Sequence, residues 1–338
     1  MTSLRGRRLL FIGIGFYDYE AEIVTRVCAR GAEVLAFADR PSMLREGWIA
    51  GMLNRWGPVA RFLARRHEQS MLRQVAAWKP DQVLVIKGVD LSCDFLRTLR
   101  AAHPGIDFVL YEWDSLARLP GIEDRLPYFN RVLTFDRPDS LRRKELKFRP
   151  LFFRQRADRA GITDGDAIDI AFIGWLHSGR LAAIRNIQAQ ARAKGLVTFV
   201  YIYTGILTWL RLWLRGDAGD VHIRPIPYDT IVAVNRRTRC VLDLPHHAQG
   251  GLTMRAVEAI GFGTKLLTTA VDVAHYDFYS PDNVQIVAAD RLELDSEFIL
   301  SPMRPLAEAT RNYYSLDTWL TEVLEPAEDL RAGRVAVS

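Results

Sequence analysis

Residues 250–269 read GGLTMRAVEAIGFGTKLLTT and place a loop, a helix and a strand in quick succession. Two glycines open the stretch, an apolar strand closes it, and Arg255 and Glu258 lie one turn apart on the helix between them. The preceding residues 239–246, RCVLDLPH, are nearly continuous in apolar side chains, as expected for a strand buried on both faces of a parallel sheet. This part of the chain therefore predicts a strand–loop–helix–strand unit of a parallel α/β domain.

The loop before this helix falls at the carboxyl end of the predicted sheet, where open α/β sheets bind their ligands. Gly250 and Gly251 would let the backbone approach a ligand closely. We expect the helix to begin near Leu252 or Thr253, with its unpaired N–H groups facing the same loop. A helix N-terminus in this position suits a phosphate group.

Arg255 lies in the first helical turn and can add charge-assisted hydrogen bonds to the same anion. Glu258 lies one turn further along, and its carboxylate can accept hydrogen bonds from both hydroxyls of a ribose. Together the two residues predict a site for a nucleoside diphosphate. The competing interpretation is an ordinary capped helix with an Arg–Glu pair, which is worth only ~0.2–0.5 kcal/mol.

The alternation of strand and helix runs through the whole chain and restarts once. An apolar run ending in GIGF is followed by a helical pattern and a second strand at 34–39, which predicts a β–α–β unit. The polar stretch 154–167 has no periodicity and is interpreted as a linker. We therefore expect an N-terminal Rossmann-like domain at 1–153 and a C-terminal one at 168–338, whose last helix is a candidate for packing on the first domain.

The composition excludes several classes of protein. Of the 338 residues, 49% are hydrophobic and 25% charged, which is typical of globular domains. The net charge of +5 is compatible with phosphate-bearing ligands or anionic surfaces. Cys28, Cys93 and Cys240 are too widely spaced for a disulfide framework or a zinc site, and they favour a reducing cytoplasm. No stretch reaches the length of a membrane span.

Four acidic residues follow neighbouring predicted strands: Glu112 and Asp114 in VLYEWDS, and Asp136 and Asp139 in LTFDRPDS. Because the carboxyl ends of parallel strands share one edge of the sheet, these side chains are candidates to line one cleft and to deprotonate a hydroxyl group. A pair of them could instead hold a metal, although no D-x-D motif occurs. Asp114 and Asp139 could equally cap helices.

Two basic and aromatic segments, 45–75 and 206–216, carry Trp, Leu and Arg at helical spacing. Such helices can rest on an anionic membrane with Trp and Leu inward and Arg outward. The competing interpretation is a helix packed on the core whose arginines face water. The aromatic residues lie in apolar runs and no nucleic-acid-reading motif is present, so we expect no nucleic acid as a partner.

The order of elements in 240–270 resembles the donor-binding segment of GT-B glycosyltransferases. In that family a Gly-rich loop, a helix with a Glu-Ala pair, a small-residue turn and a strand follow one another. Glu258 with Ala259 matches the second Glu of the family's paired-glutamate motif, whereas the position of the first Glu is Gly250. The resemblance, which points to the glycosyltransferases of bacterial surface-polysaccharide clusters, implies an α/β fold with two Rossmann-like domains facing across a cleft.

The resemblance also assigns nucleotide-binding roles in the second domain. The turn in FIGWLHSGR would face the diphosphate, and the end of the next strand would border the nucleotide. The residues concerned are Gly174, His177, Arg180, Tyr203 and Thr204. The competing interpretation is a surface turn whose His and Arg are solvated.

On the acceptor side, the loop GIGFYDYE of the first domain would face the cleft. Asp18 in this loop thereby joins Glu112, Asp114 and Asp136 as a candidate general base. The competing role for Asp18 is that of a helix N-cap.

The function implied is the transfer of a sugar from a nucleotide-sugar donor to a saccharide or lipid-linked acceptor in bacterial polysaccharide or glycolipid synthesis. The cytoplasm, at the inner face of the cell membrane, is the expected location. We expect no metal and no cofactor beyond the nucleotide-sugar, because Arg255 with Arg180 or His177 would neutralise the leaving diphosphate. The alternatives are a non-catalytic GT-B-like scaffold protein of polysaccharide assembly and a polyol-phosphate transferase.

Overall fold

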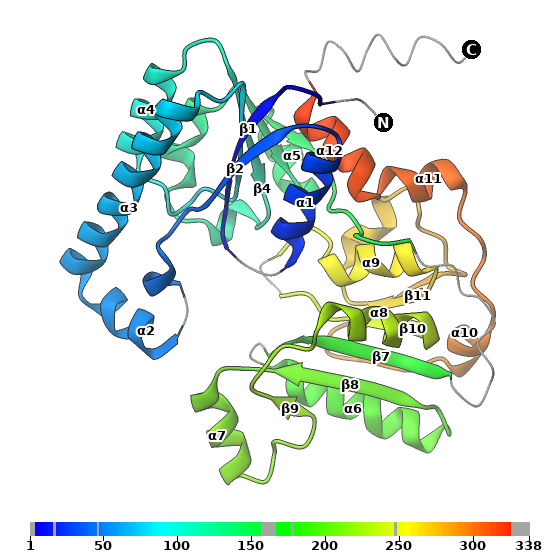
Figure 1. Cartoon of the computed structure of the whole chain (residues 1–338). Coiled ribbons are helices and arrows are strands. Elements are labelled where there is room, and N and C mark those ends of the chain that lie inside the picture. The colour runs from blue at the N-terminus through cyan, green and yellow to red at the C-terminus, as the bar shows by residue number, and fades with distance from the viewer. Residues whose placement is uncertain are drawn as a thin grey trace, which may run out of the picture. The chain divides into compact units, whose positions relative to one another are not determined.

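The protein was analysed as a computed structural model, which describes residues 4–15, 18–45, 47–156, 167–176, 179–246 and 249–325, without the side chains of 18 and 47–49. The chain divides into two compact units. The first comprises Met1–Pro150, Ala248–Gly251 and Leu316–Ser338, and the second comprises Leu151–His247 and Leu252–Ser315. Each unit contains one six-stranded sheet in which neighbouring strands are parallel (Figure 1).

The sheet of the first unit has the strand order β2-β1-β3-β4-β5-β6. Its strands are β1 (Arg8–Gly13), β2 (Glu33–Ala38), β3 (Gln82–Ile86), β4 (Asp107–Glu112), β5 (Arg131–Thr134) and β6 (Leu146–Phe148). Its helices are α1 (Asp18–Ala29), α2 (Gly47–Arg55), α3 (Gly57–Trp78), α4 (Cys93–Ala102), α5 (Arg137–Arg142) and α12 (Leu316–Leu324). The strand order reverses between β1 and β3, which makes the carboxyl ends of these two strands the topological switch point of this sheet.

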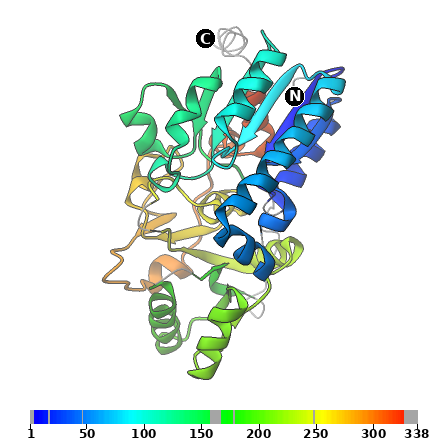
Figure 2. The same ribbon diagram turned by 90° about the vertical axis from the view of Figure 1, so that its left-hand side faces the viewer.

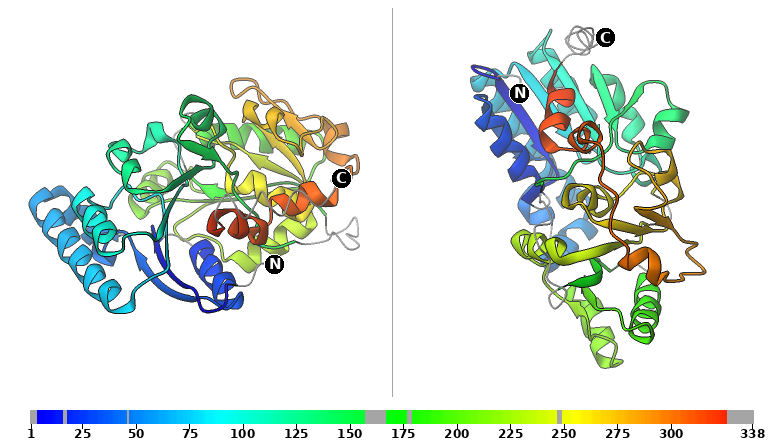
Figure 3. Two further views of the ribbon diagram at one scale, coloured as in Figure 1. Left: turned by 90° about the horizontal axis from the view of Figure 1, so that it is seen from above. Right: turned by 90° about the vertical axis from the view of Figure 1, so that its right-hand side faces the viewer.

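Helices cover both faces of this first sheet (Figure 3, left). On one face α3 and α4 contribute Met71 and Phe95 to a buried cluster with Leu10 and Val83 of the strands. Figure 2 views this helical layer from outside. On the other face α1 and α12 lie in contact with each other. Burial on both faces explains why the strands read as apolar runs rather than as alternating patterns.

The helix α12 is held in the first unit by contacts with residues far earlier in the chain. Trp319 is fully buried, and its ring meets that of Tyr111 edge-on with 4.8 Å between centroids. The Asp317 carboxylate accepts hydrogen bonds from Arg26 at 2.8 Å and from Arg30 at 3.0 Å. The helix therefore completes the core of this unit although it is encoded some 200 residues after most of it.

The sheet of the second unit has the order β12-β11-β10-β7-β8-β9. Its strands are β7 (Ile168–Trp175), β8 (Thr198–Tyr203), β9 (Val221–His222), β10 (Thr238–Asp243), β11 (Lys265–Thr268) and β12 (Val284–Ile286). Its helices are α6 (Arg180–Ala193), α7 (Ile206–Leu214), α8 (Tyr228–Arg237), α9 (Met254–Phe262), α10 (Ser296–Leu300) and α11 (Glu308–Tyr313). Counted from β7, this is the strand order of a six-stranded Rossmann fold, with its switch point between β7 and β10.

The second sheet is also covered on both faces. Figure 1 shows α6 on one side of β7 and β8, and α8 and α9 on the other. Ile184 of α6 packs with Phe172, whereas Val234 of α8 packs with Ala171, the neighbouring strand residue that points the opposite way. The two sheets confirm the predicted α/β class with two Rossmann-like units.

We predict that Trp319→Ala lowers the free energy of unfolding by about 3–5 kcal/mol, because it empties a fully buried aromatic site. Denaturant unfolding of the full chain measures the change. Trp56→Ala is the matched control, since Trp56 is 67% exposed and its removal should change stability by no more than about 0.5 kcal/mol. Equal unfolding midpoints for the two variants would contradict the packing of α12 described above.

Candidate functional site

The carboxyl edge of the second sheet is organised around Asp243, the last residue of β10, whose side chain is fully buried. Its carboxylate accepts three hydrogen bonds. The donors are Arg255 Nη1 at 2.8 Å, Thr253 Oγ1 at 2.7 Å and Thr268 Oγ1 at 3.1 Å. One buried carboxylate thus fixes the beginning of α9 against the end of β10.

The helix α9 begins beside this carboxylate with a capped N-terminus. Thr253 is the N-cap residue in extended conformation, and its Oγ1 accepts from the backbone N–H of Ala256 at 3.2 Å. The same hydroxyl donates to Asp243, so it is both a donor and an acceptor. The positive end of the helix therefore lies at the switch point, where an anion is favoured.

Arg255 extends from the first turn of α9 across the end of β7. Its Nε donates to the carbonyl of Ile173 at 2.9 Å, and its guanidinium lies 4.5 Å from the ring centre of Phe172. A Cβ atom at Gly174 would overlap Nη2 of Arg255. A side chain at position 174 would therefore force the Arg255 guanidinium to move, and this contact rather than a left-handed backbone explains the glycine.

Arg180, the first residue of α6, joins the ends of the same two strands. Its guanidinium donates to the carbonyl of Trp175 at 2.8 Å and to the carbonyl of Leu244. Burial, assisted by the nearby charge of Arg255 and opposed by that of Asp243, lowers the pKa of Arg180 to about 10. Arg255 is paired with the Asp243 carboxylate and Arg180 is bonded to backbone carbonyls, which leaves a net positive charge at the switch point.

Two aromatic rings lie next to this charge. Trp175 is 41% exposed and meets Tyr203 edge-on with 5.4 Å between centroids. Thr204, which follows β8, is buried, and its N–H donates to the carbonyl of His222 at 2.9 Å. The predicted residues Gly174, Arg180 and Tyr203 therefore lie at the ends of β7 and β8, while Trp175 is an addition that sequence reasoning missed.

Glu258 lies one turn after Arg255 on α9, and its side chain contacts a different set of residues. Its carboxylate is buried and accepts from the backbone N–H of Arg154 at 3.2 Å and from the hydroxyl of Tyr228 at 3.4 Å. The Arg154 guanidinium stacks 3.7 Å from the Tyr228 ring centre. Arg255 pairs with Asp243, so the structure differs from the simple Arg–Glu helix pair considered above.

Gly250 and Gly251 approach side chains of the first unit, to which they belong. Both backbone N–H groups donate to Oδ2 of Asp136 at 3.1 Å, and a Cβ atom at Gly251 would overlap the ring of Phe135. The paired glycines are thus explained by a close approach of backbone to protein side chains. Leu252, the next residue, is buried in the second unit.

Asp136 uses its carboxylate for structure. It is the N-cap of α5, accepting from the N–H of Asp139 at 3.1 Å, and Ser115 also donates to it. With the two glycine amides this makes four donors, and the side chain is only 1% exposed. The arrangement favours a capping role over the predicted role as a general base, which stays a prediction.

Glu112 and Asp114 lie together at the carboxyl end of β4. Asp114 forms ion pairs with Lys87 at 2.8 Å and with Arg118 at 2.6 Å. Glu112 is fully buried, and its carboxyl oxygens have no hydrogen-bond partner among the residues that the structure describes. Burial raises the pKa of Glu112 well above its usual range, with Lys87 opposing the effect.

Asp39, which follows β2, is a second buried carboxyl at this edge and was missed by sequence reasoning. It is 3% exposed, and within the described part of the chain its Oδ2 has no hydrogen-bond partner. Burial raises the pKa of Asp39 to about 7, assisted by the charges of Asp90 and Glu20 and opposed by Lys87. Lys87 itself adopts a left-handed backbone, an uncommon conformation for a residue with a side chain.

A common signal could have found these missed residues. Asp39, Lys87 and Asp243 each close an apolar run at the carboxyl end of a strand, in VLAFAD, VLVIK and CVLD. Carboxyl ends of parallel strands face the ligand-binding edge, so a charge at that point is informative.

Some predicted site residues lie outside the part of the chain that the structure describes. His177 and the side chain of Asp18 are among them, although α1 begins at Asp18. For the described ranges, no three His, Cys, Asp or Glu side chains gather as metal ligands would. Within the same ranges, no helix combines the length and the apolar character needed to cross a membrane.

Comparison with known proteins supports the fold. A sequence-family profile described as glycosyl transferase-like matches residues 183–311, a stretch that contains Asp243 and Arg255 but spans less than half of the chain. The crystal structure of MurG from Acinetobacter baumannii is similar at a TM-score of 0.50 and 13% identity, covering 94% of this chain and 99% of that chain. This likeness confirms the predicted GT-B-like fold class.

Two further structures are similar at lower TM-scores. The glycosyltransferase SnogD from Streptomyces nogalater has a TM-score of 0.47 and 14% identity, covering 99% of this chain and 100% of that chain. A co-structure of S. aureus MnaA with UDP has a TM-score of 0.48 and 9% identity, covering 87% of this chain and 86% of that chain. No curated protein matches the chain.

We predict that Asp39→Asn stabilises the protein more at pH 8 than at pH 5. Between the unfolded pKa near 4 and the folded pKa of about 7, the folded chain retains a proton that the unfolded chain has lost. The stability of the wild type therefore falls as the pH rises through this window, and the substitution removes that loss. The advantage of the variant should widen by on the order of 2–3 kcal/mol between pH 5 and pH 8.

Denaturant unfolding at the two pH values measures this difference. Asp94→Asn is the control, because the Asp94 side chain is 79% exposed and should give a nearly constant difference. A constant difference for Asp39→Asn as well would show that its carboxyl is ionised normally.

Proposed function

We propose that the protein is a glycosyltransferase that moves a sugar from a nucleotide-sugar donor to an acceptor hydroxyl. The observation that carries the proposal is the pair of guanidinium groups at the switch point of a Rossmann-ordered sheet: Arg255 pairs with Asp243, and Arg180 donates to the backbone carbonyls of Trp175 and Leu244 nearby. An anion with two negative groups would complete this arrangement. The glycosyl transferase-like profile over 183–311 supports the same class of reaction.

In the proposed reaction, the bond between the anomeric carbon of the sugar and the diphosphate oxygen breaks while the acceptor oxygen bonds to that carbon. The bonding electrons leave with the nucleoside diphosphate, so negative charge develops on the departing oxygen. Arg180, Arg255 and the N-terminus of α9 stabilise that charge. A metal-independent reaction follows as part of the proposal, because fixed positive groups of the protein take the role of a cation.

The nucleoside is assigned to the neighbouring groups. The exposed ring of Trp175 with Tyr203 offers an apolar surface for the base. Glu258 is proposed to hold the ribose, for which its carboxylate must exchange the hydroxyl of Tyr228 for those of the sugar. The ribose assignment therefore requires that Glu258 give up the hydrogen bond from Tyr228 when the nucleotide binds.

The acceptor is assigned to the first unit, where a carboxylate takes the proton of the attacking hydroxyl. Asp114, beside Lys87 at the end of β4, is the favoured candidate, with Glu112 and Asp18 as further ones. A saccharide or a lipid-linked saccharide is the proposed acceptor. Bacterial polysaccharide or glycolipid synthesis in the cytoplasm, at the inner face of the cell membrane, is the proposed setting.

One observation favours a second candidate function, a non-catalytic binding protein of polysaccharide assembly. The position of the family's first motif glutamate is Gly250, whose N–H is bonded to Asp136. Such a protein would bind a nucleotide-sugar without consuming it. Release of the free nucleoside diphosphate from a panel of nucleotide-sugars, in the presence and absence of saccharide acceptors, separates the two candidates.

The first experiment is a thermal-shift panel with UDP, GDP, CMP, TDP, ADP and their sugars. A ligand at one hundred times its dissociation constant stabilises the folded chain by about 2.7 kcal/mol. If no nucleotide shifts the unfolding transition, the proposed donor site is wrong.

We predict that Gly174→Ala weakens nucleotide binding by about tenfold or more, because the added methyl group would displace the Arg255 guanidinium. Gly205→Ala is the matched control, since a Cβ atom there meets nothing within 4 Å. Isothermal titration with the nucleotide selected by the panel measures both dissociation constants. Equal affinities for the two variants would remove Arg255 from the site.

We predict that Glu258→Ala abolishes most of the nucleotide-induced thermal shift, because the ribose loses its acceptor. Tyr228→Phe is the control: it removes a protein partner of Glu258 and leaves the carboxylate in place. A thermal shift that survives Glu258→Ala unchanged would refute the ribose assignment and leave the diphosphate site untouched.

A further inference from the structure

The helix α7 of the second unit is apolar on both of its faces. Trp209 and Leu212 pack against the buried cluster of this unit, and Trp209 Nε1 donates to the carbonyl of Val221 at 3.0 Å. The remaining surface of the helix is exposed. It carries five large apolar side chains: Ile206 at 63% exposure, Leu207 at 70%, Leu210 at 43%, Trp213 at 58% and Leu214 at 71%.

The spacing of these five residues makes them one continuous surface. Residues three, four and seven positions apart lie on the same side of a helix, so 206, 210, 213 and 214 form a stripe with 207 at its edge. The exposed apolar area is on the order of several hundred Å², which is the size at which a patch on a single chain marks an interaction site. We call these five residues the α7 face.

The charge around the α7 face is of one sign. Residues 205–216 contain Arg211 and Arg215, both exposed, and no Asp or Glu. The acidic residues that follow are engaged elsewhere, since Asp217 pairs with Arg185 at 2.8 Å and Asp220 accepts from Gln188 at 2.9 Å. An apolar stripe flanked by arginines is therefore complementary to a surface that is apolar inside and anionic outside.

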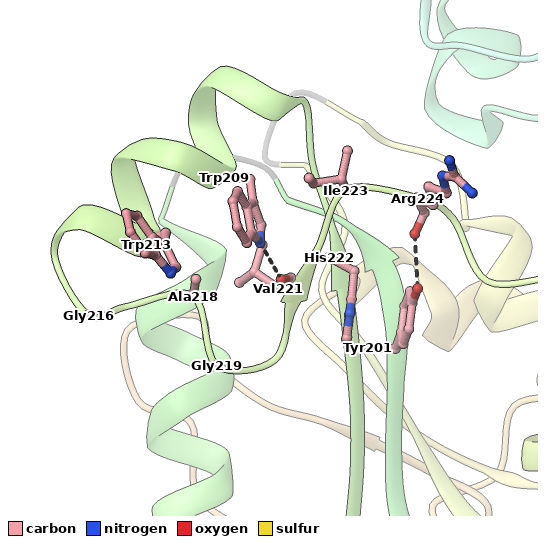
Figure 4. Close-up of a pocket in the computed structure, with 10 residues that line it drawn as sticks. All are labelled: Tyr201, Trp209, Trp213, Gly216, Ala218, Gly219, Val221, His222, Ile223 and Arg224. Atoms are coloured by element: carbon pink, nitrogen blue, oxygen red, sulfur yellow. Dashed lines mark hydrogen bonds between the residues drawn. The ribbon is translucent and has the colours of Figure 1, made fainter.

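An open pocket of about 740 Å³ lies between α7 and the segment 216–224 that follows it. Figure 4 shows Trp209 and Trp213 extending from α7 toward the turn that contains Ala218, with Arg224 further along the chain after β9. Trp213 thus belongs both to the α7 face and to the wall of the pocket. The helix is anchored at Trp209, whose ring stacks on that of Trp213 with 6.4 Å between centroids, while the other four side chains of the α7 face are exposed.

We propose that the α7 face lies in the interfacial region of an anionic membrane, with Ile206, Leu207, Leu210, Trp213 and Leu214 among the acyl chains. Arg211 and Arg215 then contact headgroup phosphates. An amphipathic indole such as that of Trp213 is favoured at this depth. The proposal does not depend on transferase activity.

A second copy of the chain is a poorer occupant of this face. A stable interface buries about 800 Å² per partner, more than a helix of this length exposes. A symmetric pairing of two α7 helices would also bring the arginines of both copies together. A bilayer has neither restriction, because its surface is extended and its charge is opposite.

The test is co-sedimentation of the full chain with vesicles of phosphatidylcholine alone and of phosphatidylcholine with phosphatidylglycerol. We expect the wild type to bind the anionic vesicles and to be released by high salt. The double variant Leu207→Glu with Leu214→Glu should lose binding by about tenfold or more. The matched double variant Leu141→Glu with Val271→Glu, at sites 70% and 72% exposed, should bind as the wild type does.

A second pair of variants separates charge from apolar contact. Arg211→Glu with Arg215→Glu should abolish the preference for phosphatidylglycerol. Trp56→Glu with Phe62→Glu alters the other exposed basic and aromatic segment, in α2 and α3, and should leave part of the binding.

Four outcomes would overturn the proposal. They are a wild type that does not bind, binding that is unchanged in the Leu207 and Leu214 variant, binding lost only in the Trp56 and Phe62 variant, and a concentration-dependent dimer abolished by the α7 substitutions without any lipid binding. Analytical ultracentrifugation of each variant measures the last of these, and circular dichroism verifies folding.

Discussion

The buried carboxylate of Asp243 is the interaction on which the candidate site depends. It holds the N-cap Thr253 and the guanidinium of Arg255 at the end of β10, and its charge raises the pKa of Arg180 against the effect of burial. Removing one partner from a buried charge pair costs about 3–5 kcal/mol, because the remaining charge is left without compensation. Asp243 compensates the charge of Arg255, and the charge of Arg180 is what an anionic ligand would neutralise.

The two switch points of the protein differ in their chemistry. The second unit presents arginines and a helix N-terminus, whereas the first presents buried carboxyls, Glu112 and Asp39, on either side of Lys87 in the chain. Burial holds both carboxyls toward their protonated form, and the nearby ammonium group opposes this in each case. A cationic edge suits a diphosphate, and carboxyl groups suit hydrogen bonding to a hydroxyl group. This division of charge matches the donor and acceptor roles that we propose for the two units.

The sequence by itself determined the class of the fold and the local frame of the site. Continuous apolar runs that alternate with helical patterns predict parallel strands covered on both faces, and both sheets have that form. The start of α9 follows from Thr253, a capping residue directly before a helical pattern. Gly174, Arg180 and Arg255 could be proposed as candidate site residues from the sequence because the ends of strands and the starts of helices depend on adjacent residues.

Only the tertiary structure decided which of these residues meet. Arg180 reaches Leu244, 64 positions away, and Asp317 reaches Arg26, 291 positions away. Such pairings depend on the order in which strands enter the sheet, and residue periodicity reports burial without reporting order. For the same reason the amides of Gly250 and Gly251, expected to face a ligand, are bonded to Asp136. The sequence shows that backbone N–H groups at a loop need acceptors, and the packing of distant segments decides which acceptors they reach.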